Sequence, residues 1–130
     1  MRSLEHLDAY RLARDLSVEI YRLTRSHPLA RHRGLADQIS RAAISIPANI
    51  AEGYALGTRR QFLRGVRIAF GSATELRTHV WIAERVGALP ARAATDLDAR
   101  LDRISAMLVG LLKRYGAQVG DGPHPVHGER

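Results

Sequence analysis

Residues 38–53 read QISRAAISIPANIAEG, and this stretch decides the fold. Its apolar residues recur at steps of three and four, which predicts a helix with one buried face. Pro47 nevertheless stands in the helix interior, where its missing N–H and its ring cost about 3 kcal/mol. Arg41, Asn49 and Glu52 stand among the apolar positions. The segment therefore carries residues that packing alone does not require.

The position of Pro47 allows two interpretations. In the first, the proline causes a tolerated kink, and the side chain of Ser45 or Asn49 hydrogen-bonds the backbone groups that it frees. In the second, the kink shapes the end of the helix, where Asn49 and Glu52 lie just ahead of Gly53. An acid at this end faces the negative end of the helix dipole, so Glu52 is expected to have a cationic neighbour.

Outward from this stretch, the chain shows four amphipathic segments separated by turn residues. They run approximately over Leu4–Arg25, Leu35–Gly53, Thr58–Gly87 and Ala91–Tyr115. Thr58 followed three residues later by Gln61 predicts a capping box at the start of the third helix. The short links and the 3–4 periodicity predict an all-α, antiparallel up-and-down four-helix bundle over residues 3–116. The Gly- and Pro-rich residues 117–130 are predicted to form a disordered tail.

Composition narrows the class of protein. A chain of 130 residues corresponds to one domain, and the absence of cysteine excludes disulfides and thiolate metal sites. No apolar run approaches the roughly 20 residues of a membrane helix, and the N-terminus lacks the apolar region of a signal peptide. We expect a cytoplasmic protein without metal or cofactor, in which His124 and His127 of the tail are incidental.

A second block, IAFGSATEL over residues 68–76, follows the first at a fixed interval. Together the two blocks resemble a family of small four-helix bundle proteins. That family includes the 23S rRNA intervening-sequence proteins and the accessory (variability determinant) protein of diversity-generating retroelements. The resemblance covers residues 3–116. It marks a set of structural motif positions: Arg41, Pro47, Asn49, Glu52, Gly53, Gly71, Ser72 and Glu75.

The resemblance also implies partners. Related bundles form cyclic pentamers, so a homo-oligomer is expected here. The retroelement accessory protein binds nucleic acid and a reverse transcriptase, and both are therefore possible partners of this chain. A second, partly apolar stripe on the third helix indicates that this helix packs against more than one neighbour, either within its own bundle or in another subunit, and the resemblance favours another subunit. The stripe comprises Gly65, Ile68, Ser72, Glu75, His79, Ile82 and Val86.

The turn over Tyr54–Gly57 suggests how the second and third helices face each other. Folding about it places residues opposite when their numbers sum to about 111. This register predicts an Arg41–Glu75 ion pair, and a cluster of Glu52 with Arg59 and Arg60. The small residues of the third helix, Gly65, Gly71 and Ser72, are expected where another backbone approaches closely.

Positive charge concentrates on the third helix. The chain carries 20 basic residues, all but one of them Arg, against 13 acids, for a net charge of +7. Such an excess can reflect a GC-rich genome, or it can serve a polyanion. The predicted nucleic-acid-binding residues are Arg59, Arg60, Arg64, Arg67 and Arg85, the last of them beside Trp81. The alternatives are an ordinary solvated face and a protein-interaction scaffold without a nucleic-acid role.

Catalytic motifs are missing from the sequence. It has no cysteine nucleophile, no nucleophile elbow and no phosphate-binding glycine loop. A di-iron bundle would need paired Glu-x-x-His motifs, whereas Glu75 and His79 are four apart and occur once. We therefore expect a non-enzymatic protein.

Overall fold

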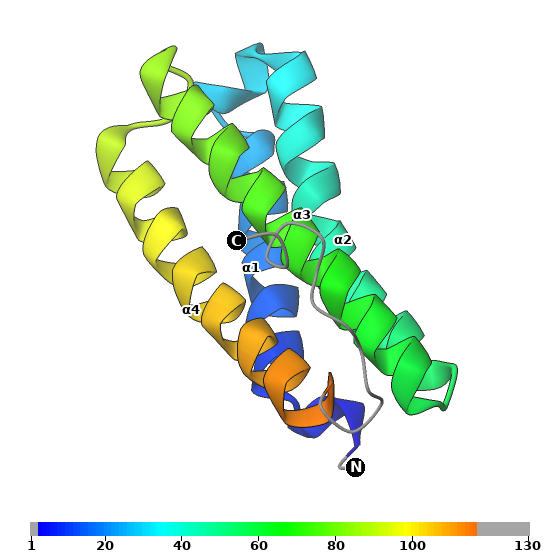
Figure 1. Cartoon of the computed structure of the whole chain (residues 1–130). Helices are drawn as coiled ribbons and strands as arrows, with labels where there is room; N and C mark the ends of the chain where they lie inside the picture. The colour runs from blue at the N-terminus through cyan, green and yellow to red at the C-terminus, as the bar shows by residue number, and fades with distance from the viewer. Residues whose placement is uncertain (1–2, 117–130) are drawn as a thin grey trace.

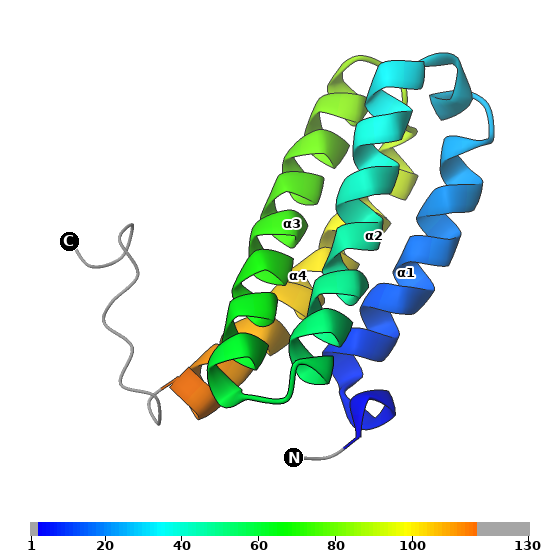
Figure 2. The same cartoon turned by 90° about the vertical axis from the view of Figure 1, so that its right-hand side faces the viewer.

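The computed structural model describes residues 3–116, which form a bundle of four long helices (Figure 1). In chain order the elements are η1 (Leu4–His6), α1 (Asp8–Thr24), η2 (Leu29–Arg31), α2 (Arg33–Ala55), α3 (Arg59–Arg85) and α4 (Ala91–Gly116). Successive long helices run in opposite directions and lie side by side, and α4 completes the bundle behind α1, α2 and α3 (Figure 2). The predicted all-α, up-and-down four-helix bundle is confirmed.

The core follows the predicted apolar stripes. On α3, the residues at steps of three and four from Phe62 to Ala83 are all buried. Leu63, Gly65 and Ser72 are buried as well, so the buried face of α3 is broader than this single stripe. A broad stripe is expected for a helix that packs against α2 on one side and α4 on the other.

The observed helix starts agree only in part with those predicted from the sequence. The Thr58 hydroxyl caps α3 by accepting the Gln61 N–H at 3.1 Å, as predicted. The Gln61 side chain accepts from the Thr58 hydroxyl at 2.9 Å instead of reaching the cap backbone. At the N-terminus, α1 begins only at Asp8, because Leu4–His6 form a separate 3-10 turn. The second helix begins at Arg33, two residues before the predicted Leu35.

The register between α2 and α3 corrects the predicted one. Gly53 packs on Gly65, and the Ser45 hydroxyl is 2.7 Å from the Ser72 hydroxyl. The numbers of facing residues therefore sum to 117 or 118, as 53 and 65 or 45 and 72 do, instead of 111. The sum is higher because the connection lies later in the chain than assumed: α2 continues to Ala55 and α3 begins at Arg59, so residues 56–58 connect the two helices.

The predicted Arg41–Glu75 ion pair is wrong. In the observed register Arg41 is level with this part of α3, but it is exposed, since its neighbours Ala42 and Ala43 are the residues turned into the core. Glu75 instead contacts His79 one turn along the same helix, at 3.3 Å between Oε2 and Nε2. The predicted ion pair does not form because Arg41 points outward, although it lies at a suitable height along the bundle.

Two further local predictions are also wrong. The Glu52 carboxylate is exposed and makes no hydrogen bond or ion pair within residues 3–116, so the cluster with Arg59 and Arg60 does not form there. Gly71 is exposed, and a β-carbon added to it would meet no atom within 4 Å. Close backbone approach on α3 is therefore a property of Gly65 and not of Gly71.

The predicted tail, with His124 and His127, lies outside the described residues. Within the part of the chain that the structure describes, no group of three or more His, Cys, Asp or Glu side chains is placed to hold a metal ion. None of the helices in that part is both long enough and apolar enough to cross a membrane.

Candidate functional site

The proline inside α2 changes how this helix contacts its neighbour α1. Pro47 leaves the carbonyl of Ala43 without its helical donor, and the Ser17 hydroxyl of α1 lies 2.9 Å from that oxygen. The same hydroxyl is 2.8 Å from the Ala13 carbonyl, so its single proton serves two acceptors. The compensation for Pro47 comes from a neighbouring helix and not from Ser45 or Asn49.

Ser45 and Asn49 have a different task, which is to join α2 to α3. The Asn49 amide donates to the Ser45 carbonyl at 2.8 Å and to the Ser45 hydroxyl at 2.9 Å. The Ser45 and Ser72 hydroxyls then share the hydrogen bond between the helices. We call Ser45, Gly53, Gly65 and Ser72 the glycine–serine seam. Its members bring α2 and α3 into direct contact.

The outward face of α3 carries three of the five arginines that are predicted to bind nucleic acid. Arg60, Arg64 and Arg67, which we call the arginine cluster, follow steps of four and three over the first turns of the helix. Arg60 and Arg64 are exposed, and Arg67 is half-buried. Three guanidinium groups on one helix face, beside the positive end of the helix dipole, produce a region of concentrated positive potential.

Arg85 lies at the far end of the same helix. Its guanidinium stacks over the Trp81 ring at 4.2 Å from the centroid, and 55% of Trp81 is exposed. Eighteen residues separate Arg85 from Arg67, which is about 27 Å along a helix. The exposed residues between them, none of which is cationic, are Ile68, Gly71, Thr74, Glu75, Thr78, Trp81, Ile82 and Glu84. The structure thus separates the arginine cluster from Arg85 by a stretch of α3 that has no exposed cation.

Other arginines connect helices to each other. Arg77 binds Asp98 at 2.9 Å and Asp102 at 3.2 Å, which joins α3 to α4. The hydrogen bond that Arg77 donates to the Asp98 carboxylate is the main cause that raises the pKa of Arg77. Arg100 binds Glu19 at 2.8 Å and so joins α4 to α1. These cations are neutralised by carboxylates, whereas Arg60 and Arg64 make no ion pair within residues 3–116.

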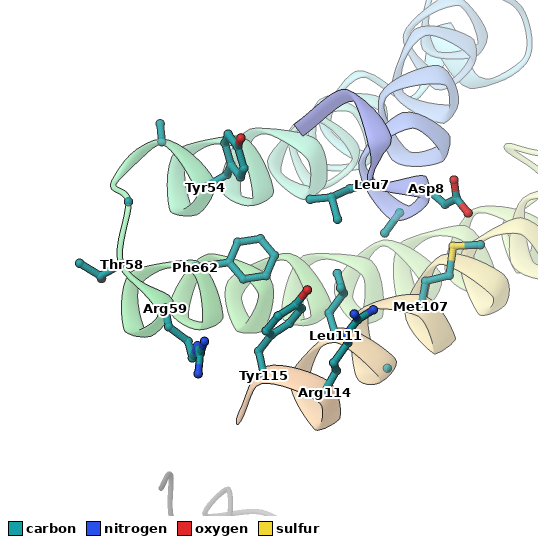
Figure 3. A pocket seen from close by; sticks show the side chains of 14 residues that line it. Leu7, Asp8, Tyr54, Thr58, Arg59, Phe62, Met107, Leu111, Arg114 and Tyr115 are labelled. Atoms are coloured by element: carbon teal, nitrogen blue, oxygen red, sulfur yellow. The ribbon is translucent and has the colours of Figure 1, made fainter. Parts of the chain in front are cut away.

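Arg59 does not belong to the arginine cluster. It lines a cleft at the end of the bundle instead (Figure 3). This end cleft has a volume of about 1210 Å³ and lies between the start of α1, the α2–α3 turn and the last turns of α4. Its walls are largely aromatic and apolar, and two cations stand among them. The lining includes Leu7, Tyr54, Arg59, Phe62, Met107, Leu111, Arg114 and Tyr115.

The aromatic side chains of the end cleft are ordered by each other. The edge of one ring meets the face of the other between Phe62 and Tyr115, with centroids 5.9 Å apart and an interplanar angle of 89°. The Arg114 guanidinium lies over the Tyr115 ring at 5.4 Å. Sequence reasoning missed this cleft, since Phe62 and Tyr115 read as ordinary core positions of two separate helices.

Comparison with known proteins gives a family. A family model described as 23S rRNA-intervening sequence protein matches residues 5–110. No curated protein matches the chain.

A solved structure shows the same fold. It is the 1.70 Å crystal structure of a protein with unknown function from the S23 ribosomal protein family of Bacteroides thetaiotaomicron. The likeness has a TM-score of 0.76 at 21% identity and covers 81% of this chain and 95% of that one. At this identity the likeness extends to the fold alone.

Proposed function

This chain belongs to the 23S rRNA-intervening sequence protein family, and from that premise we propose that it is a non-enzymatic, oligomeric nucleic-acid-binding protein. The observation that carries the proposal is the arginine cluster at the start of α3. The name of the family refers to an intervening sequence of 23S rRNA, which agrees with an RNA partner.

The chemistry of the cluster suits phosphate. A guanidinium offers paired N–H donors that match two phosphate oxygens, and its charge is retained at all physiological pH values. Within residues 3–116, Arg60 and Arg64 donate none of these N–H groups to a carboxylate. Because each phosphate contact releases condensed counterions, binding by three arginines must weaken steeply with salt.

The test is a salt titration of binding to RNA and DNA with two matched variants. Arg60→Ala/Arg64→Ala/Arg67→Ala removes the cluster. Arg31→Ala/Arg92→Ala/Arg103→Ala removes three exposed arginines from other elements. Both variants lower the net charge from +7 to +4.

We expect the cluster variant to reduce the slope of log K against log salt by about 2–3, as for three lost contacts, and the control variant to keep most of it. Equal losses in both variants would assign binding to net charge alone. No binding by the unmodified protein at low salt would overturn the proposal.

The oligomer is proposed from a second feature of α3. Ile68, Ile82 and Val86 are 37%, 38% and 56% exposed and belong to one stripe along the helix. Apolar side chains aligned in this way are typical of a subunit contact. The pentamer and the reverse transcriptase partner, which the resemblance implies, stay predictions.

The same stripe favours the second candidate, a scaffold that binds another protein. Light scattering of Ile82→Glu/Val86→Glu separates the two interpretations. Loss of a defined oligomer supports the subunit contact. If the variant keeps the assembly state of the unmodified protein, the stripe is not a subunit contact, and the result supports binding of another protein.

A further inference from the structure

We propose that the end cleft receives an unpaired base of single-stranded RNA or DNA, which stacks on Tyr115 while Arg59 and Arg114 contact the flanking phosphates. This inference rests on the proposed nucleic-acid binding and specifies which part of the ligand is recognised. It requires a planar aromatic ligand group with negative charge on either side, and an unpaired nucleotide has both.

The cleft has the lining that base stacking needs. Tyr54, Phe62 and Tyr115 supply three aromatic rings from three different helices, as Figure 3 shows. The Tyr115 ring already makes an edge-to-face contact with Phe62 and has the Arg114 guanidinium over it, so little side-chain entropy is lost when a base arrives. Stacking on aromatic side chains tolerates any base, because every base has a π face.

The size and the charge of the cleft agree with this ligand. Its volume of about 1210 Å³ exceeds the roughly 300–1,000 Å³ of ordinary small-molecule sites, which leaves room for a nucleotide and part of its backbone. Arg59 and Arg114 make the rim positive. Asp8, the single acid among the described residues of the lining, is neutralised by its ion pair with Arg11.

The cleft also lies next to the start of the arginine cluster along α3. Arg59 lines the cleft, and Arg60 follows it at the start of the outward face of α3. A strand whose phosphates lie along the arginine cluster therefore reaches the cleft at its end. Base-paired nucleic acid cannot use the cleft, since its bases are stacked inside the duplex. The cleft thus adds a preference for single strands to binding that is otherwise independent of sequence.

The experiment uses the full chain and four probes of equal length. These are a single-stranded RNA, the corresponding single-stranded DNA, the duplex DNA, and the single strand with abasic sites, which keeps the phosphates. Tyr115→Leu removes the stacking surface and Tyr115→Phe restores it. Tyr21→Leu is the control, because Tyr21 is a half-exposed tyrosine with Arg25 over its ring at 5.3 Å, away from the cleft.

We expect Tyr115→Leu to weaken single-strand binding about 5- to 150-fold, the equivalent of roughly 1–3 kcal/mol for one stacked base. Binding of the duplex and of the abasic strand should change little, and Tyr115→Phe and Tyr21→Leu should bind like the unmodified protein. A preference of the unmodified protein for RNA or for DNA identifies the source of the base.

Two outcomes separate this inference from the proposed function. Salt-dependent binding in which intact and abasic strands bind equally, or in which a folded Tyr115→Leu loses nothing, overturns the stacking site and leaves phosphate binding intact. Thermal unfolding checks that each variant is folded, and the restored ring of Tyr115→Phe distinguishes lost stacking from lost structure. Absence of all binding at low salt overturns both proposals.

Discussion

The contact between α2 and α3 differs in kind from the junction of α3 and α4 at the end cleft. Along the glycine–serine seam the two backbones touch: a β-carbon on Gly53 would lie 2.9 Å from the Gln61 carbonyl oxygen. At the end cleft, by contrast, large side chains such as Phe62 and Tyr115 span the gap between helices and leave an open space. The seam admits only small residues for steric reasons, whereas the cleft presents side chains to a ligand.

The largest effect is expected from Gly65→Ala in the seam. The added methyl group would be 3.0 Å from the Gly53 Cα and closer still to the Asn49 carbonyl oxygen, so two backbones must separate. We expect a loss on the order of 3 kcal/mol in the free energy of unfolding, as for a strongly overpacked core. Urea unfolding followed by circular dichroism measures it.

Gly71→Ala is the matched control for this prediction. Gly71 lies on the same helix in open space, so the alanine should stabilise the protein by its helix propensity alone, about 0.5–1 kcal/mol. Equal effects of the two substitutions would contradict the account of the seam as a backbone contact.

The next effect concerns the support of Pro47. Ser17→Ala leaves the buried Ala43 carbonyl without a donor, which costs about 1–3 kcal/mol. Thr78→Ala removes an exposed hydroxyl that donates to a carbonyl of its own helix and should be close to neutral. Chemical unfolding of both variants compares them, and a neutral Ser17→Ala would show that water satisfies the carbonyl instead.

The surroundings of Pro47 show which features could be predicted from the sequence and which could not. Local signals gave correct results: the apolar period of α3 predicted its buried face, and Thr58 with Gln61 predicted its first residue. The partner of the Ala43 carbonyl lies 26 residues away on α1, and no local pattern indicates it. The Arg41–Glu75 prediction failed for a related reason, because a register assumed from the turn does not give the direction of each side chain.

The candidate site was predictable only where it lies on one helix. Arg60, Arg64 and Arg67 share a face by their spacing alone. The end cleft could not be predicted, since it is assembled from the ends of several helices whose relative height depends on the close approach of Gly53 and Gly65.

A smaller effect is expected where α3 meets α4 away from the cleft. Arg77→Met removes the ion pairs to Asp98 and Asp102 and keeps most of the apolar stem. Because these groups are partly exposed, the loss should be about 1 kcal/mol at low salt and less at high salt. Unfolding at two salt concentrations tests this, and a loss that is independent of salt would assign the effect to packing.

The smallest effect comes from a glycine of the cleft itself. Gly110 lines the cleft on α4, and a β-carbon there would meet no atom within 4 Å. Gly110→Ala should therefore stabilise the protein by about 0.5 kcal/mol, through reduced entropy of the unfolded chain. The same substitution at Gly65 is expected to have the opposite sign and a several-fold larger size. If Gly110→Ala destabilises instead, α4 must approach another backbone at this point, and the cleft would be closed to a base.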